Sequence, residues 1–140
     1  FIGAAAALKA EYTLPGISQT VILTRMEGRT PVPEAESIEK LAAHGASMVI
    51  FLSSSMLEEL STKLMQGGYS AETPAAIVYK ATWPEEKVVR TTVGQIAQAA
   101  KQHGIHKTAL VLVGGFLGEE YARSLLYHPA FSHEFRKAKD

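Results

Sequence analysis

The sequence predicts an α/β fold built on a mixed, partly antiparallel sheet flanked by helices. The first observation behind this prediction is an alternation along the chain, in which short β-branched or apolar runs are separated by segments with helical spacing of apolar residues. The second is that two strand-like runs, residues 75–79 and 87–90, follow each other with no helix between them. Such neighbours form an antiparallel hairpin, so the sheet is expected to be mixed.

Five segments have the composition of strands. Residues 48–52 and 109–113 are continuous apolar runs, which suit strands buried on both faces of a sheet. β-branched residues favour the strand conformation in residues 19–24 and in the short segment 87–90. With residues 75–79 as the remaining strand, the expected order of elements is β, α, β, α, β, β, α, β.

Helices are expected in the segments between the strands. Ser55 with Glu58, and Thr92 with Gln95, have the spacing of N-terminal capping boxes for two of them. Glycines follow these two helical segments and a third that begins at residue 34, and glycine is a common helix C-terminus. The expected helical segments are residues 1–10, 34–44, about 56–66, 92–103 and 119–126.

Composition limits the functional classes that fit this chain. Its 140 residues suit one domain, 1–140, and are enough to bury a core. Lys plus Arg and Asp plus Glu number 14 each, so no overall basic field indicates nucleic acid. The chain has no cysteine, which excludes disulfides and thiolate metal ligands. The apolar runs are too short to cross a membrane, and no signal peptide is recognisable.

Common catalytic constellations are weakly represented. His103 and His106 are spaced like a helical pair, but Gly104 between them breaks the helix, so solvent-facing loop positions are the favoured interpretation. His128 and His133 have no acidic helical partner, and no protein-bound metal is expected. Ser53–Ser55 lacks the flanking glycines of a nucleophile elbow, and helix capping explains it better. The glycines of 114–118 do not complete a phosphate-binding motif; a turn that lines a pocket is the favoured interpretation.

A specific resemblance comes from residues 12–34, which read YTLPGISQTVILTRMEGRTPVPE. This run resembles the precorrin-4 and cobalt-precorrin-4 methyltransferases, which belong to the tetrapyrrole methylases. The resemblance continues along all 140 residues, but only to the back half of such an enzyme. The first residue is Phe1 and not Met, which fits a C-terminal piece. The resemblance therefore implies one half of a two-domain methyltransferase, with residues 1–14 as the linking helix and an N-terminal domain as its missing partner.

The resemblance also implies a ligand and its site. These enzymes transfer a methyl group from S-adenosylmethionine (SAM) to ring carbon 11, and SAM lies between the two domains. The back domain contributes residues that correspond here to Leu52 and Ala81, with Leu117 as a further wall. Many relatives have Met and Gly at the first two positions, so Leu52 and Ala81 depart from the pattern. An ordinary core role for Leu52 and a small loop role for Ala81 are the alternatives.

Substrate contact is expected in the segment that follows the first strand. The substrate carries many carboxylates, and the arginine guanidinium binds carboxylates in a fork. Arg25 and Arg29 are therefore the candidate substrate-binding residues; the alternative is an ordinary solvated loop, in which either arginine could also pair with Glu27 or Glu34. Trp83 could stack on a ligand, but a buried packing role is favoured.

The sequence is compatible with two functions. The first is SAM-dependent methylation of precorrin-4 or cobalt-precorrin-4 in cobalamin biosynthesis, with no acid, base or metal of its own required because the sulfonium is already activated. The second is a non-catalytic α/β binding or dimerisation module. The resemblance further implies a homodimer. The absence of cysteine suits the cytoplasm, and the balanced charge and short apolar runs predict no nucleic-acid or membrane partner. Residues Leu52, Ala81 and 114–117 are expected to form one apolar face that the missing half covers.

Overall fold

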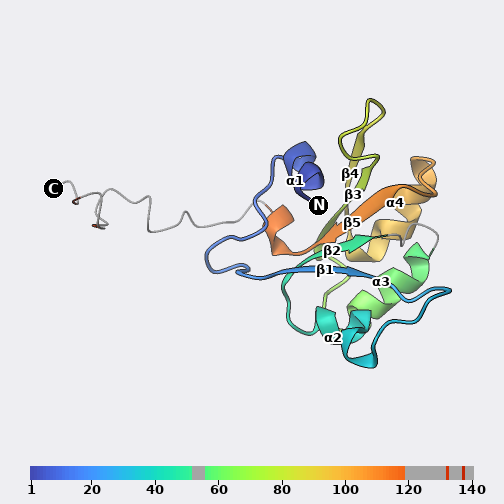
Figure 1. The fold of residues 1–140 in the computed structure, drawn as a ribbon, viewed down its shortest axis with the longest axis horizontal. Helices are drawn as coiled ribbons and strands as arrows, with labels where there is room; N and C mark the ends of the chain where they lie inside the picture. The colour runs from blue at the N-terminus through green and yellow to red at the C-terminus, as the bar shows by residue number, and fades with distance from the viewer. Residues whose placement is uncertain (52–55, 119–131, 133–136, 138–140) are drawn as a thin grey trace.

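The fold is a five-stranded mixed sheet with helices on both faces, seen in a computed structural model that describes residues 1–51, 56–118, 132 and 137 (Figure 1). The strand order is β1-β2-β5-β3-β4. β1 pairs with β2 in parallel, whereas β5 is antiparallel to both β2 and β3, and β3 is antiparallel to β4. The predicted α/β class and mixed sheet are confirmed. The strands are β1 (Val21–Arg25), β2 (Ser47–Phe51), β3 (Pro74–Tyr79), β4 (Lys87–Thr92) and β5 (Ala109–Val113).

The strand directions bring particular chain ends together. Because β1, β2 and β3 run the same way and β5 and β4 run the other way, the carboxyl ends of the first three strands share one edge of the sheet with the amino ends of the other two. Arg25, Phe51 and Tyr79 are the last residues of β1, β2 and β3. We call this border, which is formed by the ends of the strands and not by an outer strand, the Phe51 edge.

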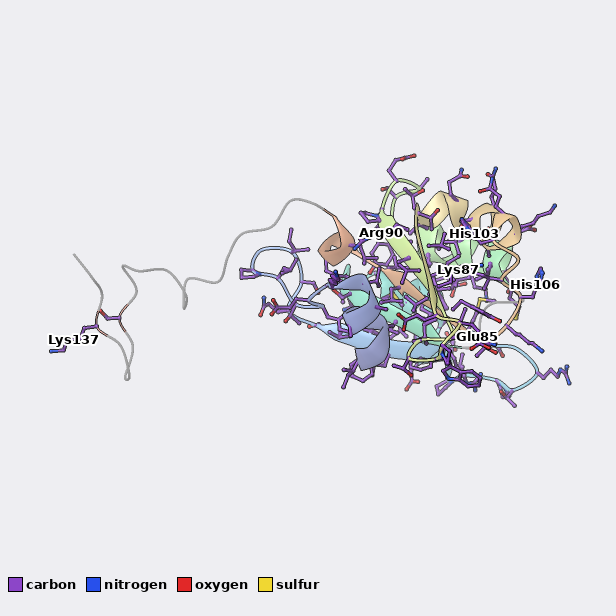
Figure 2. The ribbon with its side chains drawn as sticks, turned by 90° about the horizontal axis from the view of Figure 1, so that it is seen from above. Glu85, Lys87, Arg90, His103, His106 and Lys137 are labelled. Carbon is purple, nitrogen blue, oxygen red and sulfur yellow. The ribbon has the colours of Figure 1, made fainter. Side chains whose placement is uncertain are left out.

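The helices cover the two faces unequally (Figures 1 and 2). On one face, α2 (Ile38–Ala42), α3 (Leu57–Gln66) and α4 (Ile96–Gln102) pack against sheet residues that include Met48, Ile50, Ile77 and Val111. The opposite face carries only α1 (Ile2–Leu8) and the 3-10 turn η3 (Gly115–Leu117) among the described elements, packed on Val49, Ala76, Val78 and Leu112. We call the second face the α1 face.

The α1 face is incompletely covered at both outer strands. Leu23 of β1 lies in register with Val49, and Val88 of β4 lies in register with Val78, so both belong to this face. Leu23 is 47% exposed and Val88 is 37% exposed. The two side chains lie on opposite outer strands, with β2, β5 and β3 between them.

Two predicted helix starts were wrong. The segment 34–44 forms the 3-10 turn η1 (Glu34–Glu36) and then α2, because the Ser37 hydroxyl accepts a hydrogen bond from the Lys40 N–H (3.4 Å) and starts the helix there. Thr92 makes no side-chain cap; the 3-10 turn η2 (Val93–Gln95) follows it, and α4 begins only at Ile96. The α3 helix starts after Met56, while Ser55 and the expected helix at 119–126 lie outside the described residues.

Candidate functional site

Ala81 lies in the β3–β4 loop, immediately beyond the Phe51 edge. The loop turns sharply there, since the two neighbours of Ala81 have positive φ angles, 46° at Lys80 and 71° at Thr82. The Lys80 N–H donates to the Thr108 carbonyl (2.8 Å), and the Thr82 N–H donates to Glu86 Oε2 (2.7 Å). In contrast, the N–H and C=O of Ala81 have no hydrogen-bond partner among the described residues. The backbone at Ala81 can therefore bind a ligand that offers both a donor and an acceptor.

A small cavity opens beside Ala81. It has a volume of about 240 Å³ and is lined by residues from β2, β3, β5 and the loops at the Phe51 edge. We call it the Ala81 pocket; its lining residues are Phe51, Val78, Lys80, Ala81, Trp83, Thr108, Ala109 and Leu110. Most of these side chains are apolar or aromatic, so the pocket favours a flat, uncharged group.

Lys80 is the one charged side chain among the described residues that line the Ala81 pocket, and it is paired. Lys80 Nζ lies 3.2 Å from Glu85 Oε1, and it lies 5.3 Å from the centroid of the Trp83 ring. The hydrogen bond with Glu85 raises the pKa of Lys80. The pKa of Glu85 is lowered by a backbone hydrogen bond and by Lys80. Lys80 and Glu85 therefore form an ion pair at the rim, and the pocket offers no unpaired cation to repel a positively charged ligand.

A second cavity lies on the other side of Phe51. Its volume is about 380 Å³, and Phe51 lines both it and the Ala81 pocket. We call it the Arg25 pocket; its lining residues are Leu23, Thr24, Arg25, Val32, Pro33, Glu36 and Phe51. The two cavities are thus neighbours along the Phe51 edge, one mainly apolar and one that includes charged and hydroxyl groups.

Arg25 and Arg29 have different surroundings in the loop that follows β1. Arg25 Nη1 donates to the Thr30 carbonyl (3.1 Å), and Nη2 donates to the Pro31 carbonyl (2.9 Å). A longer contact joins Nη1 to the Met26 carbonyl (3.4 Å). Arg29 is exposed and makes no hydrogen bond or ion pair with another described residue. Arg25 therefore fixes the shape of its own loop, and Arg29 is accessible to a ligand.

The alternative pairing of these arginines with acidic neighbours does not occur. Glu34 is instead 2.8 Å from Lys40 Nζ, and Glu27 makes no ion pair with a described residue. The Arg–Glu pairs are therefore not formed, whereas the exposure of residues 27–31 agrees with a solvated loop, which Arg25 itself holds in shape.

The remaining predicted donor-site residues are not all brought together. Leu52 follows Phe51 directly but lies outside the described residues. Leu117 is buried in η3, beyond the carboxyl end of β5, and so lies at the opposite edge of the sheet from Ala81. Leu117 and Ala81 both contact the α1-face cluster. The expectation of one compact apolar patch overlooked the antiparallel direction of β5, which separates the two positions.

Arg90 lies beside Leu117 rather than beside Ala81. It donates through Nη2 to the Leu8 carbonyl (3.1 Å) and through Nη1 to the Leu117 carbonyl (3.3 Å). These bonds join the end of α1 to η3. A cavity of about 290 Å³ next to them is lined by Lys9, Ala10, Glu11, Leu14, Arg90, Phe116, Leu117 and Gly118.

Trp83 is more exposed than the sequence predicted. The favoured interpretation was a buried packing aromatic, but the side chain is 55% exposed and lines the Ala81 pocket. The sequence signal for this position was available, since a Trp-Pro pair inside a hairpin loop is unlike a core strand. Trp83 is therefore a site residue that sequence reasoning undervalued.

Other candidate chemistry lies apart from these pockets. Figure 2 shows His103 and His106 beside the end of α4, whereas Glu85 marks the β3–β4 loop. A larger cavity of about 590 Å³ between α3 and α4 includes His106, Lys101, Glu58 and Glu59, and it opens on the face opposite α1. Within the described residues no group of three or more His, Cys, Asp or Glu side chains could hold a metal ion. None of the described helices has the length and apolar character needed to span a bilayer.

Comparisons with known proteins identify relatives of this chain. A cobalt-precorrin-4 C(11)-methyltransferase from Methanocaldococcus jannaschii is 52% identical over 136 residues, which cover 96% of this chain and 52% of that protein. A precorrin-4 C(11)-methyltransferase from Sinorhizobium sp is 40% identical over 138 residues, with 97% of this chain and 54% of that protein covered. The chain therefore spans about half the length of these curated relatives.

The fold comparison agrees with the sequence comparison. The X-ray structure of a cobalt precorrin-4 methyltransferase superposes with a TM-score of 0.81 at 49% identity, covering 83% of this chain and 48% of that one. The sequence profile of the tetrapyrrole (corrin/porphyrin) methylases matches residues 1–97, which is more than half of the 140 residues. By sequence and by fold, the chain belongs to the tetrapyrrole methylases.

Proposed function

We propose that this chain is the C-terminal half of a SAM-dependent methyltransferase that acts on ring carbon 11 of precorrin-4 or cobalt-precorrin-4 in cobalamin biosynthesis. The proposal is supported by the 52% identity to a cobalt-precorrin-4 C(11)-methyltransferase, over a stretch that is about half of that protein. The observation that carries it is the position of Phe51, which lines both the Ala81 pocket and the Arg25 pocket. Methyl transfer requires two ligands side by side, and two neighbouring cavities with different linings suit that requirement.

The Ala81 pocket is the proposed donor side. Leu52 and Ala81 are the residues proposed to hold SAM, and the unpaired N–H and C=O of Ala81 suit the edge of its adenine base. Leu117 remains a proposed further wall, reached across the α1 face. When bound, SAM supplies an activated methyl group. The protein's own contribution is then to orient the two ligands and exclude water, which needs shape and backbone groups more than titratable side chains.

The Arg25 pocket is the proposed acceptor side. Arg29 is the proposed contact for a carboxylate of the tetrapyrrole, because its guanidinium is exposed and has no described partner. Arg25 is proposed to shape the pocket by holding the carbonyls of Thr30 and Pro31. A cobalt ion, where present, belongs to the substrate.

The proposal includes partners outside this chain. An N-terminal domain would provide the opposite wall of the donor site, and residues 1–14 would connect the two halves. A cytoplasmic homodimer is proposed by the same family resemblance, and light scattering of the two-domain protein would measure its mass.

Calorimetry tests whether the donor site needs both this chain and the N-terminal domain. The demethylated product S-adenosylhomocysteine is titrated into the 140-residue chain and into the chain extended at its N-terminus to the length of the relatives. The extended protein is expected to bind and to methylate precorrin-4 or its cobalt form, whereas the shorter chain is expected to do neither.

A matched pair of variants tests whether S-adenosylhomocysteine binds at Ala81. Replacing Ala81 with Phe fills the Ala81 pocket and is expected to abolish binding to the extended protein, whereas Met65→Phe on the opposite face should leave it intact. If the extended protein folds but binds no S-adenosylhomocysteine, the chain is better described as a binding or dimerisation module without turnover.

A further inference from the structure

We propose that Trp83 is a ligand-contacting residue of the donor site, whose indole ring packs against the flat adenine base of SAM. The inference rests on the proposed function and adds a residue to it. Trp83 lines the Ala81 pocket together with Phe51 and Ala81, and its side chain is 55% exposed. A large aromatic side chain left accessible at the rim of an apolar pocket is positioned to cover a ligand rather than to fill the core.

The loop that carries Trp83 is held in place from several sides. The Trp83 N–H donates to the Lys80 carbonyl (2.9 Å), and the Glu86 N–H donates to the Trp83 carbonyl (3.0 Å). α1 packs closely against the same loop: a β-carbon added to Gly3 would lie 2.5 Å from Thr82 Cγ2. Trp83 is therefore presented by a fixed backbone, so a ligand that binds it pays little to order the loop.

The dimensions of the pocket suit one ring system of a ligand. A volume of about 240 Å³ is below the range of about 300–1,000 Å³ that accommodates a whole drug-sized ligand. One purine base fits such a space, with the rest of the ligand outside it. The unpaired backbone groups of Ala81 also match the donor and acceptor edge of adenine.

The charges around Trp83 suit a neutral base attached to a cationic sulfonium. Lys80 Nζ lies 5.3 Å from the Trp83 ring centroid and 5.5 Å from that of Tyr79, while its charge is paired with Glu85. The ammonium group therefore helps to orient the indole through its ring face without leaving a net positive charge beside the ligand.

Fluorescence measures this contact without an activity assay. Trp83 is the one tryptophan of the 140-residue sequence, so in the extended two-domain protein the difference between wild type and Trp83→Phe isolates its emission. S-adenosylhomocysteine is the probe. Its addition is expected to change the Trp83 emission in proportion to the occupancy measured by calorimetry.

Affinities of variants of the extended protein provide the second test. Trp83→Ala is expected to weaken binding of S-adenosylhomocysteine by about 5- to 150-fold, as loss of one base–aromatic stack does. Trp83→Phe keeps a ring and is expected to stay within about threefold of wild type. Met65→Ala, an exposed apolar side chain on α3, is the control and should leave the affinity unchanged. Thermal unfolding of each variant shows that the effects are not losses of fold.

The possible contrary results are distinct from one another. Unchanged affinity in Trp83→Ala, with no emission change in wild type, overturns the role of Trp83 while the donor site stands. Unchanged affinity with a raised KM for the tetrapyrrole overturns the base assignment and moves Trp83 to the acceptor side. Wild-type protein that binds no S-adenosylhomocysteine overturns the proposed function itself.

Discussion

Arg25 shows how one side chain can determine the shape of a loop. Its guanidinium holds the carbonyls of Thr30 and Pro31, whereas Arg29 holds no described group. Arg25→Gln is expected to lower the free energy of unfolding by about 1–3 kcal/mol, because it removes charge-assisted hydrogen bonds. Arg29→Gln is expected to change it by less than about 0.5 kcal/mol, as an exposed substitution does. Urea unfolding of the two variants measures both effects, and equal losses would contradict the positioning role of Arg25.

Tyr69 predicts a dependence of stability on alkaline pH. Its hydroxyl donates to the Ala46 carbonyl, and burial raises the pKa of Tyr69 to about 12 from an ordinary value of 10.0. Folding therefore favours the neutral phenol. That stabilisation is complete below pH 10 and is lost as the pH rises from 10 towards about 12, where the folded protein also ionises.

Tyr69→Phe isolates this contribution. The variant is expected to lose about 1 kcal/mol of unfolding free energy at neutral pH, because the substitution removes the hydrogen bond. Its stability should also decline less steeply than that of wild type above pH 10, with the remaining decline shared by Tyr12, whose pKa burial raises to about 12 as well. Identical pH profiles for wild type and variant, measured by urea unfolding, would contradict the assignment.

At the scale of the element, α1 ends in a strained residue. Lys9 follows the helix with φ 52° and ψ 40°, a left-handed conformation that glycine adopts without a steric penalty. Lys9→Gly is therefore expected to be more stable than Lys9→Ala by about 1 kcal/mol. Both variants remove the same charge, so their difference in denaturant midpoint reports the backbone alone. A more stable alanine variant would show that unfolded-state entropy outweighs the strain at this position.

The strands were predictable because their sequence pattern is local. The start of α4 was not predictable, because contacts with distant residues determine it. The apolar runs of β2 and β5 are buried on both faces, as continuous apolar sequence indicates. The expected cap at Thr92 failed for a tertiary reason: the Val93 N–H donates to the Thr73 carbonyl, and the Gly94 N–H donates to the Ala71 carbonyl. A distant loop supplies the acceptors that the capping box would have provided, and no local pattern contains that information.

The order of the strands was equally outside the reach of the sequence pattern. β5 lies between β2 and β3, so the last of the described strands occupies the middle of the sheet. This placement puts Phe51 and Ala81 at one edge and sends Leu117 to the other. The family resemblance proposes residues for the donor site, but the meeting of two cavities at Phe51 became visible only in three dimensions. The exposure of Trp83 was indicated by its place in a Trp-Pro loop and was undervalued.

At the scale of the whole molecule, the described residues cover the α1 face sparsely. Among them, one short helix and a 3-10 turn pack on this face, and Leu23 and Val88 are left partly exposed at its two sides. The relatives are about twice as long as this chain, which provides a domain of suitable size to cover it. We therefore expect the α1 face to be buried in the extended protein.

Leu23→Ser tests that expectation in proteins of two lengths. In the 140-residue chain Leu23 is 47% exposed, so the substitution removes little buried area and is expected to cost less than about 1 kcal/mol. In the extended protein the same change should cost about 1–2 kcal/mol more, because a leucine side chain removed from water contributes about 1.5–3 kcal/mol. Met65→Ser, on the opposite face and 38% exposed, should have the same small effect in both lengths. Denaturant unfolding of the four variants and of the wild type in each length decides the question: equal costs for Leu23→Ser in both lengths would place the additional domain away from the α1 face.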